Sequence, residues 1–189
     1  MPVQPFVSLR AREDLRASLC VPQGHTGFAV GLDGRKILEC GTHDIRPLSP
    51  TTVFLVRVGA LHVLELTPLG NSILRDDAGR WQPLQVLGHL EYSVANAERL
   101  MDALERNAIL EASEFEQELR HLVLDRVNSF LECDSWRVET LSDSIECATS
   151  ELYVHIEEAL GHLGIQLQSF ELSTSIGAPG TPLSPRGLA

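Results

Sequence analysis

The feature that most constrains the fold is a long amphipathic segment followed at once by an alternating one, at residues 142–173. Gly164 divides the two, and because glycine lacks a Cβ it readily adopts the left-handed conformation that ends many helices. After it, Ile165 and Leu167 alternate with glutamines, which predicts a half-buried strand with a bulge where the alternation slips at Ser169 and Phe170. Before it, apolar residues share one helix face: Ile145, Leu152, Ile156, Ala159, Leu160 and Leu163.

The first half of the chain has the patterns of β-structure. Residues 21–31 and 36–40 flank Asp33-Gly34, which predicts a hairpin. Further strand-like runs lie at residues 53–58, 61–66 and 84–94. The intervening segment 67–80 reads as turn-rich. Residues 1–20 fit an arm, a strand or a short helix equally well, and we assign them as an N-terminal arm.

The apolar period then changes from two to 3.6 residues. Asn96 is a cap for a helix that ends at Asn107, and Ser113 with Glu116 forms a capping box for a helix to about residue 131. Arg126 projects into the apolar stripe of that second helix, where pairing with a nearby carboxylate is the favoured interpretation over a functional anchor.

Together these patterns predict one α+β domain at residues 21–173. It has a β-rich part (21–94), a helical part (95–163) and a closing strand (165–173). The expected architecture is a strongly twisted, largely antiparallel sheet packed by about three helices, near residues 97–107, 113–131 and 142–163. Residues 174–189 are rich in Pro, Gly and Ser and predict a flexible tail.

Charge and hydropathy limit the partners. The net charge of −11 with a single lysine argues against nucleic-acid binding and against simple docking on anionic lipid. The charge is uneven, because residues 1–57 hold 7 basic against 5 acidic residues and the remainder 8 against 21. No apolar run approaches the ~18 residues of a membrane-spanning helix, and the beginning of the sequence lacks a secretory pattern, so we expect a soluble cytoplasmic protein.

No motif for a nucleophilic serine, a phosphate loop or a dinucleotide is present, so we predict neither catalytic residues nor a cofactor. The four cysteines lack metal-ligand spacing and are interpreted as reduced, mostly buried thiols. His25 and His43, in expected loops, are assigned structural hydrogen bonds. Asp76 and Asp77 are assigned to a turn rather than to acid-base chemistry.

One group of side chains has the types and spacing of a metal site. Glu151, His155, Glu158 and His162 follow one another at i, i+4, i+7 and i+11, which places them on one flank of the helix at residues 142–163. Carboxylates and imidazoles suit zinc and other divalent ions. A solvated helix face gives the same pattern, and it is the favoured interpretation.

In chain order, several of these segments resemble the SPFH (band-7) domain of stomatins, prohibitins and flotillins. The resemblance rests on V-P-Q-G-H-T-G-F-A-V at residues 21–30, G-R-K-I-L-E-C-G-T-H at 34–43, L-H-V-L-E-L at 61–66, G-H-L-E-Y-S-V at 88–94, and E-L-Y-V-H-I-E-E-A-L-G-H-L-G-I-Q-L-Q-S-F-E-L at 151–172. It spans roughly residues 20–175. The chain looks most similar to the anchorless, virion-core-protein-like bacterial branch, because neither a membrane hairpin nor a long coiled coil accompanies the domain.

The resemblance implies a non-enzymatic scaffold or recruitment module that self-associates or docks another protein. It also implies peripheral contact with the inner face of a membrane through a partner. Two alternatives stay open at this point. One is a soluble adaptor that binds partners without membrane contact, and the other is a metal-dependent enzyme that uses the His/Glu flank of the long helix.

Overall fold

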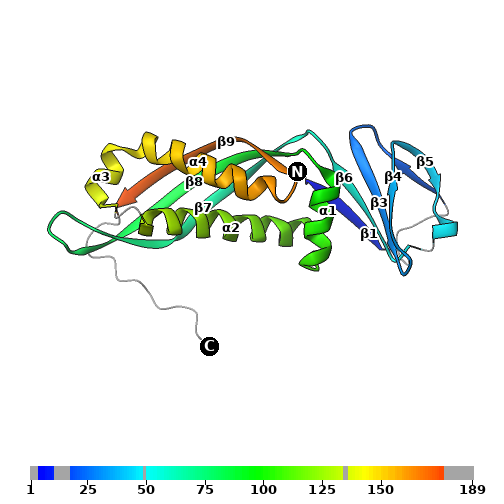
Figure 1. Cartoon of the computed structure of the whole chain (residues 1–189), viewed down its shortest axis with the longest axis horizontal. Helices are drawn as coiled ribbons and strands as arrows, with labels where there is room; N and C mark the ends of the chain where they lie inside the picture. The colour runs from blue at the N-terminus through cyan, green and yellow to red at the C-terminus, as the bar shows by residue number, and fades with distance from the viewer. Residues whose placement is uncertain (1–3, 11–17, 49, 134–135, 177–189) are drawn as a thin grey trace, which may run out of the picture.

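The protein is elongated, with a small all-β end and a longer end in which helices pack on a sheet (Figure 1). The computed structural model describes residues 4–10, 18–48, 50–133 and 136–176. All strand pairs among these residues are antiparallel. These described segments contain four α-helices and nine strands, which confirms the prediction of an α+β fold.

The all-β end contains two sheets. Its larger sheet has four strands in the order β1-β6-β3-β4, and the smaller pairs β2 with β5. Gly34, with φ +105°, starts β4 and completes the predicted hairpin with β3. The bounds are β1 (Phe6–Arg10), β2 (Ser18–Val21), β3 (His25–Gly31), β4 (Gly34–Leu38), β5 (Gly41–Asp44) and β6 (Thr52–Arg57), with a 3-10 turn at Arg46–Leu48.

A small core fills the space between these two sheets. It consists of buried side chains from both: Leu19, Val21, Ala29, Leu38, Ile45 and Val53. The other face of the four-stranded sheet carries Phe6, Phe28 and Phe54 into the main core, where Phe6 lies edge-on to Phe115 of α2 (Ala112–Cys133) at 5.9 Å between ring centroids. Phe6–Arg10 of the predicted N-terminal arm is therefore a strand of the folded domain.

The third sheet runs along the longer end. It consists of β7 (Leu61–Arg75), β8 (Trp81–Val94) and β9 (Ile165–Ile176), in the order β7-β8-β9. Asp76 closes the β7–β8 hairpin, because its carboxylate accepts hydrogen bonds from the Arg80 backbone N–H (2.8 Å) and from Arg80 Nε (2.9 Å). Residues 67–75, predicted as turn-rich, instead continue β7 with register shifts after Leu66 and Leu69.

The prediction of a single sheet from residues 21–94 and 165–173 is wrong, because the described strands form three sheets. Gly59, with φ +73°, redirects the chain after β6, so that β7 pairs with β8 and leaves the first sheet. The predicted closing strand is confirmed, since Gly164 has φ +76° and β9 pairs with β8. Its bulge is at Gln168, between the pairs Tyr92–Leu167 and Glu91–Ser169.

The helices are α1 (Ala97–Arg106), α2 (Ala112–Cys133), α3 (Val138–Asp143) and α4 (Ile145–Gly161). Asn96 caps α1 as predicted, accepting a hydrogen bond from the Arg99 backbone N–H at 3.0 Å. The capping box at Ser113 and Glu116 is wrong, because α2 starts one residue earlier and the Glu114 carboxylate receives the N–H groups of Leu110 and Glu111. The predicted helix at 142–163 is also divided, since Ser144 (φ −123°, ψ 25°) leaves helical geometry and separates α3 from α4.

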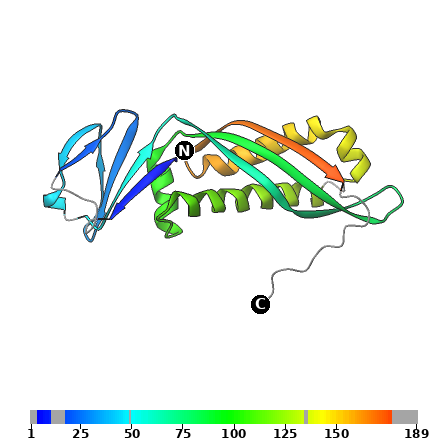
Figure 2. The ribbon, with the colours of Figure 1, turned by 180° about the vertical axis from the view of Figure 1, so that it is seen from behind.

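Both long helices cover the same face of the three-stranded sheet. On β7, residues 62, 64 and 66 are buried and residues 61, 63 and 65 are exposed, so one face packs and the other does not. Figure 2 shows the molecule from behind, with the strands on the viewer's side of the helices. Of the predicted tail, residues 174–176 belong to β9, and residues 177–189 lie outside the described residues.

Candidate interaction surfaces

The four side chains of the predicted metal flank all lie on the exposed surface of α4 and its end. Glu151 accepts a hydrogen bond from the Cys147 thiol at 3.7 Å, and the His155 ring centroid lies 6.4 Å from that of Phe130. Among the residues that the structure describes, no group of three or more His, Cys, Asp or Glu side chains is placed to hold a metal ion. The structure therefore does not bring Glu158 and His162 together with the other two as ligands.

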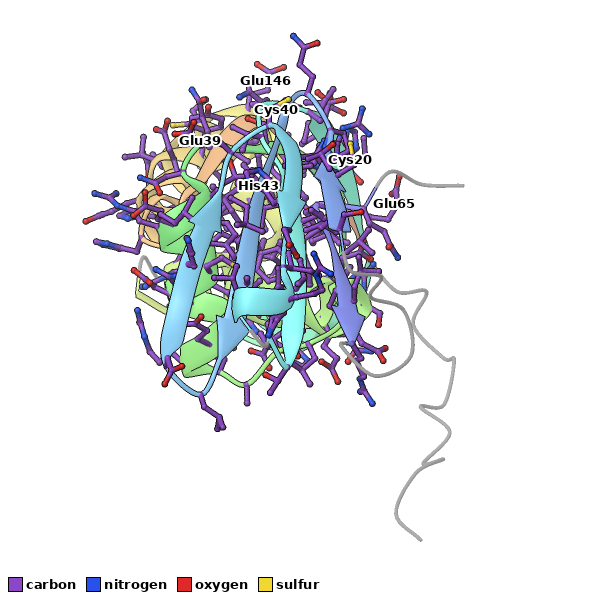
Figure 3. The ribbon with its side chains drawn as sticks, turned by 90° about the vertical axis from the view of Figure 1, so that its right-hand side faces the viewer. Cys20, Glu39, Cys40, His43, Glu65 and Glu146 are labelled. Carbon is purple, nitrogen blue, oxygen red and sulfur yellow. The ribbon has the colours of Figure 1, made fainter. Side chains whose placement is uncertain are left out.

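Of the other histidines and cysteines, His25, His43, Cys20 and Cys40 lie in the all-β end, and Cys147 lies in α4. His25 Nδ1 lies 3.2 Å from the Gln23 carbonyl, and His43 Nε2 lies 2.7 Å from the Glu39 carbonyl, as expected for structural hydrogen bonds. The prediction of buried thiols is wrong for Cys20, Cys40 and Cys147, which are free and exposed. Figure 3 shows Cys20 and Cys40 near the surface formed by β2 and β5, where the thin two-stranded sheet gives little depth to bury them.

The helix-free face of the three-stranded sheet is the first candidate surface. Two large apolar side chains of β7 are exposed there, Leu61 by 53% and Val63 by 55%. The neighbouring strands present a polar ladder on the same face: Ser169 Oγ donates to Glu91 Oε2 (2.9 Å), and Gln168 Nε2 donates to Ser93 Oγ (3.1 Å). An apolar strip beside paired polar groups is typical of a surface that a partner covers.

Side chains from the helices satisfy part of both edges of this sheet. Arg120 of α2 donates its Nε to the Glu65 carbonyl of β7 at 3.1 Å. Tyr153 of α4 donates its hydroxyl to the Leu167 carbonyl of β9 at 3.1 Å. Because an unpaired strand edge invites pairing with another chain, these bonds restrict edge pairing at those two points.

A buried polar pair lies beneath α2, on the covered face of the same sheet. His62 and Tyr92 are opposite one another on β7 and β8, with ring centroids 5.3 Å apart. Burial raises the pKa of Tyr92 well above its usual range, and the Glu116 carboxylate raises it further while Arg120 opposes the shift. Tyr92 therefore stays neutral in the folded protein at ordinary pH, as a core residue does.

A groove along α2 is the second candidate surface. It has a volume of about 400 Å³ and lies between α2, the end of α1 and the turn after α4. Its floor is apolar, formed by Ala103, Ile109, Phe115, Leu119, Leu122 and Leu163. Its rim is polar, formed by Asn107, Glu118, His121, Asp125, Arg126 and Ser129.

Arg126 lies on the rim of this groove, although the sequence alone did not predict a groove there. The prediction placed Arg126 in a buried stripe with a carboxylate partner, but its side chain is exposed and forms no ion pair with the described residues. Residues 115, 119, 122 and 126 do share one face of α2. Residues 115 and 119 on this face are buried, residue 122 is half-buried and residue 126 is exposed. The charge of Arg126 within the apolar stripe was therefore a sign that the rest of the protein covers only part of this helix face.

The helical layer carries the whole net charge of the protein. Residues 97–163 contain 16 acidic and 5 basic side chains, a charge of −11 that equals the total for the chain. The groove therefore lies in a layer of strongly negative net charge, and its own rim holds two carboxylates, Glu118 and Asp125, against one guanidinium, Arg126.

No protein-family model matches the chain, and no curated protein is significantly similar to it. Within the described residues, no helix combines the length and the apolar character that crossing a membrane requires.

Proposed function

We propose that this chain is a non-enzymatic interaction module of the SPFH type, which self-associates and recruits other proteins in the cytoplasm. Where it meets the inner face of a membrane, a partner protein brings it there. Support comes from the chain order of the motifs between residues 20 and 175 and from a closing strand that follows the long helix directly. In this proposal the protein acts through its binding surfaces, and no residue has a catalytic role.

The observation that carries self-association is the exposed apolar strip on the helix-free face. Leu61 and Val63 lie two residues apart on an edge strand, and Val58, 36% exposed, lies three residues before Leu61, directly after β6. Because Leu61 and Val63 are already about half buried, covering each with a second copy gains roughly half of the value for full burial, about 0.8–1.5 kcal/mol. A net charge of −11 opposes this gain, because like copies repel one another over a Debye length of about 8–10 Å.

Sedimentation velocity at two protein concentrations and at low and high salt tests self-association. We expect weak association that strengthens as salt screens the repulsion. The double variant Leu61→Glu, Val63→Glu should weaken it by tenfold or more, because it places charges in the apolar strip. The control is Val154→Glu on α4, since Val154 is 60% exposed but lies in the helical layer.

A wild-type protein that remains strictly monomeric under all four conditions would contradict self-association and favour the soluble adaptor. Equal loss in the Val154→Glu control would show that added charge, rather than the strip, determines the result.

Flotation with vesicles of anionic phospholipid tests the membrane part of the proposal. We expect the protein alone to stay with the soluble fraction, because its negative charge is repelled by that surface. Direct and salt-sensitive binding to the vesicles would overturn the proposal that a partner is required.

A further inference from the structure

The groove on α2 is separate from the sheet strip, and its floor is incompletely covered. Phe115 and Leu119 at its floor are fully buried, but Leu122 and Leu163 are only half-buried and face the opening. Apolar side chains that stay partly open in a concave surface lose contact with water when a ligand's apolar side chains enter. The groove therefore favours an occupant with an apolar face.

The length of the groove matches a short helix. Its α2 wall extends from Phe115 to Ser129, which at 1.5 Å per residue is about 21 Å, or about four helical turns. Amphipathic helices bind such grooves with apolar side chains at i, i+3, i+4 and i+7. The end of α1 and Leu163 provide the facing wall, so the groove has two sides against which a helix packs.

The charge around the groove favours one sign of charge on the occupant. Glu118 and Asp125 lie on the rim seven residues apart, about 10.5 Å along α2, and the surrounding helical layer carries −11. His121 and Arg126 stand on the same rim, so positive groups of an occupant must fall opposite the two carboxylates. A cationic occupant gains from this field, whereas nucleic acid and anionic lipid are repelled by it.

We propose that this groove binds a basic amphipathic helix of a partner protein, with its apolar side chains on Leu122 and Leu163 and its lysines or arginines opposite Glu118 and Asp125. The recruited partner is thus recognised by a cationic helix rather than by the sheet face used for self-association. The two surfaces are independent, so a copy that is bound to its neighbours still has a groove open to a partner.

A synthetic peptide probe tests the proposal on the full-length chain. The probe is a labelled helix of about 18 residues with leucines at i, i+3, i+4 and i+7 and lysines on its opposite face. A matched peptide carries glutamates in place of the lysines. Fluorescence anisotropy should show saturable binding of the basic peptide, weakened at high salt, and at least tenfold weaker binding of the acidic one.

Substitutions on exposed positions locate the binding site without disturbing the core. Glu118→Lys with Asp125→Lys should weaken binding of the basic probe about tenfold or more. Ser129→Trp should weaken it as well, because the indole fills the end of the groove while leaving the charge unchanged. The control Glu151→Lys with Glu158→Lys makes the same change of charge at the same seven-residue spacing on the outer flank of α4.

Several results would overturn the proposal. Equal loss of binding in the α4 control would show attraction to a general acidic surface, and so would an unaffected Ser129→Trp variant. Binding that appears only after residues 177–189 are removed would assign the groove to the chain's own tail. Altered sedimentation of the groove variants without peptide would assign it to a second copy.

Discussion

The two ends of the molecule use antiparallel sheets in different ways. At the all-β end, the central strands β3 and β6 are covered on both faces: Ala29 and Val53 pack in the small core, and Phe28 and Phe54 in the main core. At the longer end, the central strand β8 carries Leu90, Tyr92 and Val94 into the core on the helix-covered face, and its other face presents Glu91, which is half-buried, and Ser93, which is buried beside Gln168. Both faces of the four-stranded sheet are covered by the protein's own core. The helix-free face of the three-stranded sheet is not, so it is the face available to a partner.

The two ends also differ in how their turns are constrained. Gly164, which joins α4 to β9, is enclosed by backbone, and its carbonyl accepts hydrogen bonds from Ala95 and Asn96 at 2.9 Å. Gly24, in the turn before β3, has nothing within 4 Å of the position a Cβ would occupy. The turn at Gly164 therefore depends on glycine for space as well as for conformation, while the turn at Gly24 depends on it for conformation alone.

Gly164→Ala should have the largest effect of the changes considered. The new Cβ would lie 2.2 Å from the Asn96 carbonyl oxygen, in a residue whose φ is +76°. Strain and the forced backbone shift should lower the free energy of unfolding by roughly 2–5 kcal/mol. Urea denaturation of the wild type and the variant measures this loss in the free energy of unfolding.

The matched control is Gly24→Ala, which has nearly the same φ of +75° and open space around it. It should cost only the conformational term, roughly 1–2 kcal/mol. Equal losses at both positions would show that the close approach at Gly164 relaxes easily.

Ile156→Ala tests the covered face of the sheet. Ile156 is fully buried at the centre of α4, so the variant should lose roughly 2–5 kcal/mol in the same urea assay. His155→Ala, one residue away on the exposed side, should change stability little. If the histidine variant were the less stable of the two, the face of α4 that packs on the sheet would be misassigned.

Sequence patterns predicted the features that depend on neighbouring residues. The stripe of α4, the left-handed Gly164 and the strand after it follow from spacing within about twenty residues, and the structure has all three. The division into three sheets was not predictable in this way, because alternation indicates which face of a strand is buried and not which strand it pairs with. The α2 groove was missed for a related reason, since Ile109, Leu122 and Leu163 come from three separate segments.

Tyr92→Phe tests the helix-covered face of the three-stranded sheet through the pH dependence of stability. Because burial raises the pKa of Tyr92 in the folded protein, the folded state keeps the phenolic proton at a pH where the unfolded state, with an ordinary value near 10, has lost it. Stability should be fully present below about pH 10 and fall by roughly 1.4 kcal/mol per pH unit above it. The Phe variant should show a shallower alkaline decline in denaturation midpoint. Identical declines would indicate that other groups dominate.

Arg35→Ala tests how the two ends are joined, and it should have the smallest effect. Arg35 of β4 forms ion pairs with Asp102 (2.8 Å) and Glu105 (3.4 Å) of α1, and its guanidinium lies 5.5 Å from the centre of the Phe28 ring. Because the Asp102 side chain is 55% exposed, solvent screens the pair, and a double-mutant cycle of Arg35→Ala with Asp102→Ala should give a coupling of about 0.2–1 kcal/mol.

The control for this cycle is the ion pair of Arg46 with Asp44, which lies entirely within the all-β end. Its guanidinium nitrogen and carboxylate oxygen are 2.7 Å apart. Hydrogen bonds from Arg46 lower the pKa of Asp44, yet both side chains are largely in solvent, so its coupling should be weaker than that of Arg35 with Asp102. Hydrogen exchange of β3 and β4 amides supplies a second measurement. If Arg35→Ala increases exchange there while α4 stays protected, the pair holds the all-β end to α1. If exchange is unchanged, the shared aromatic packing of Phe6, Phe54 and Phe115 is sufficient to join the two ends.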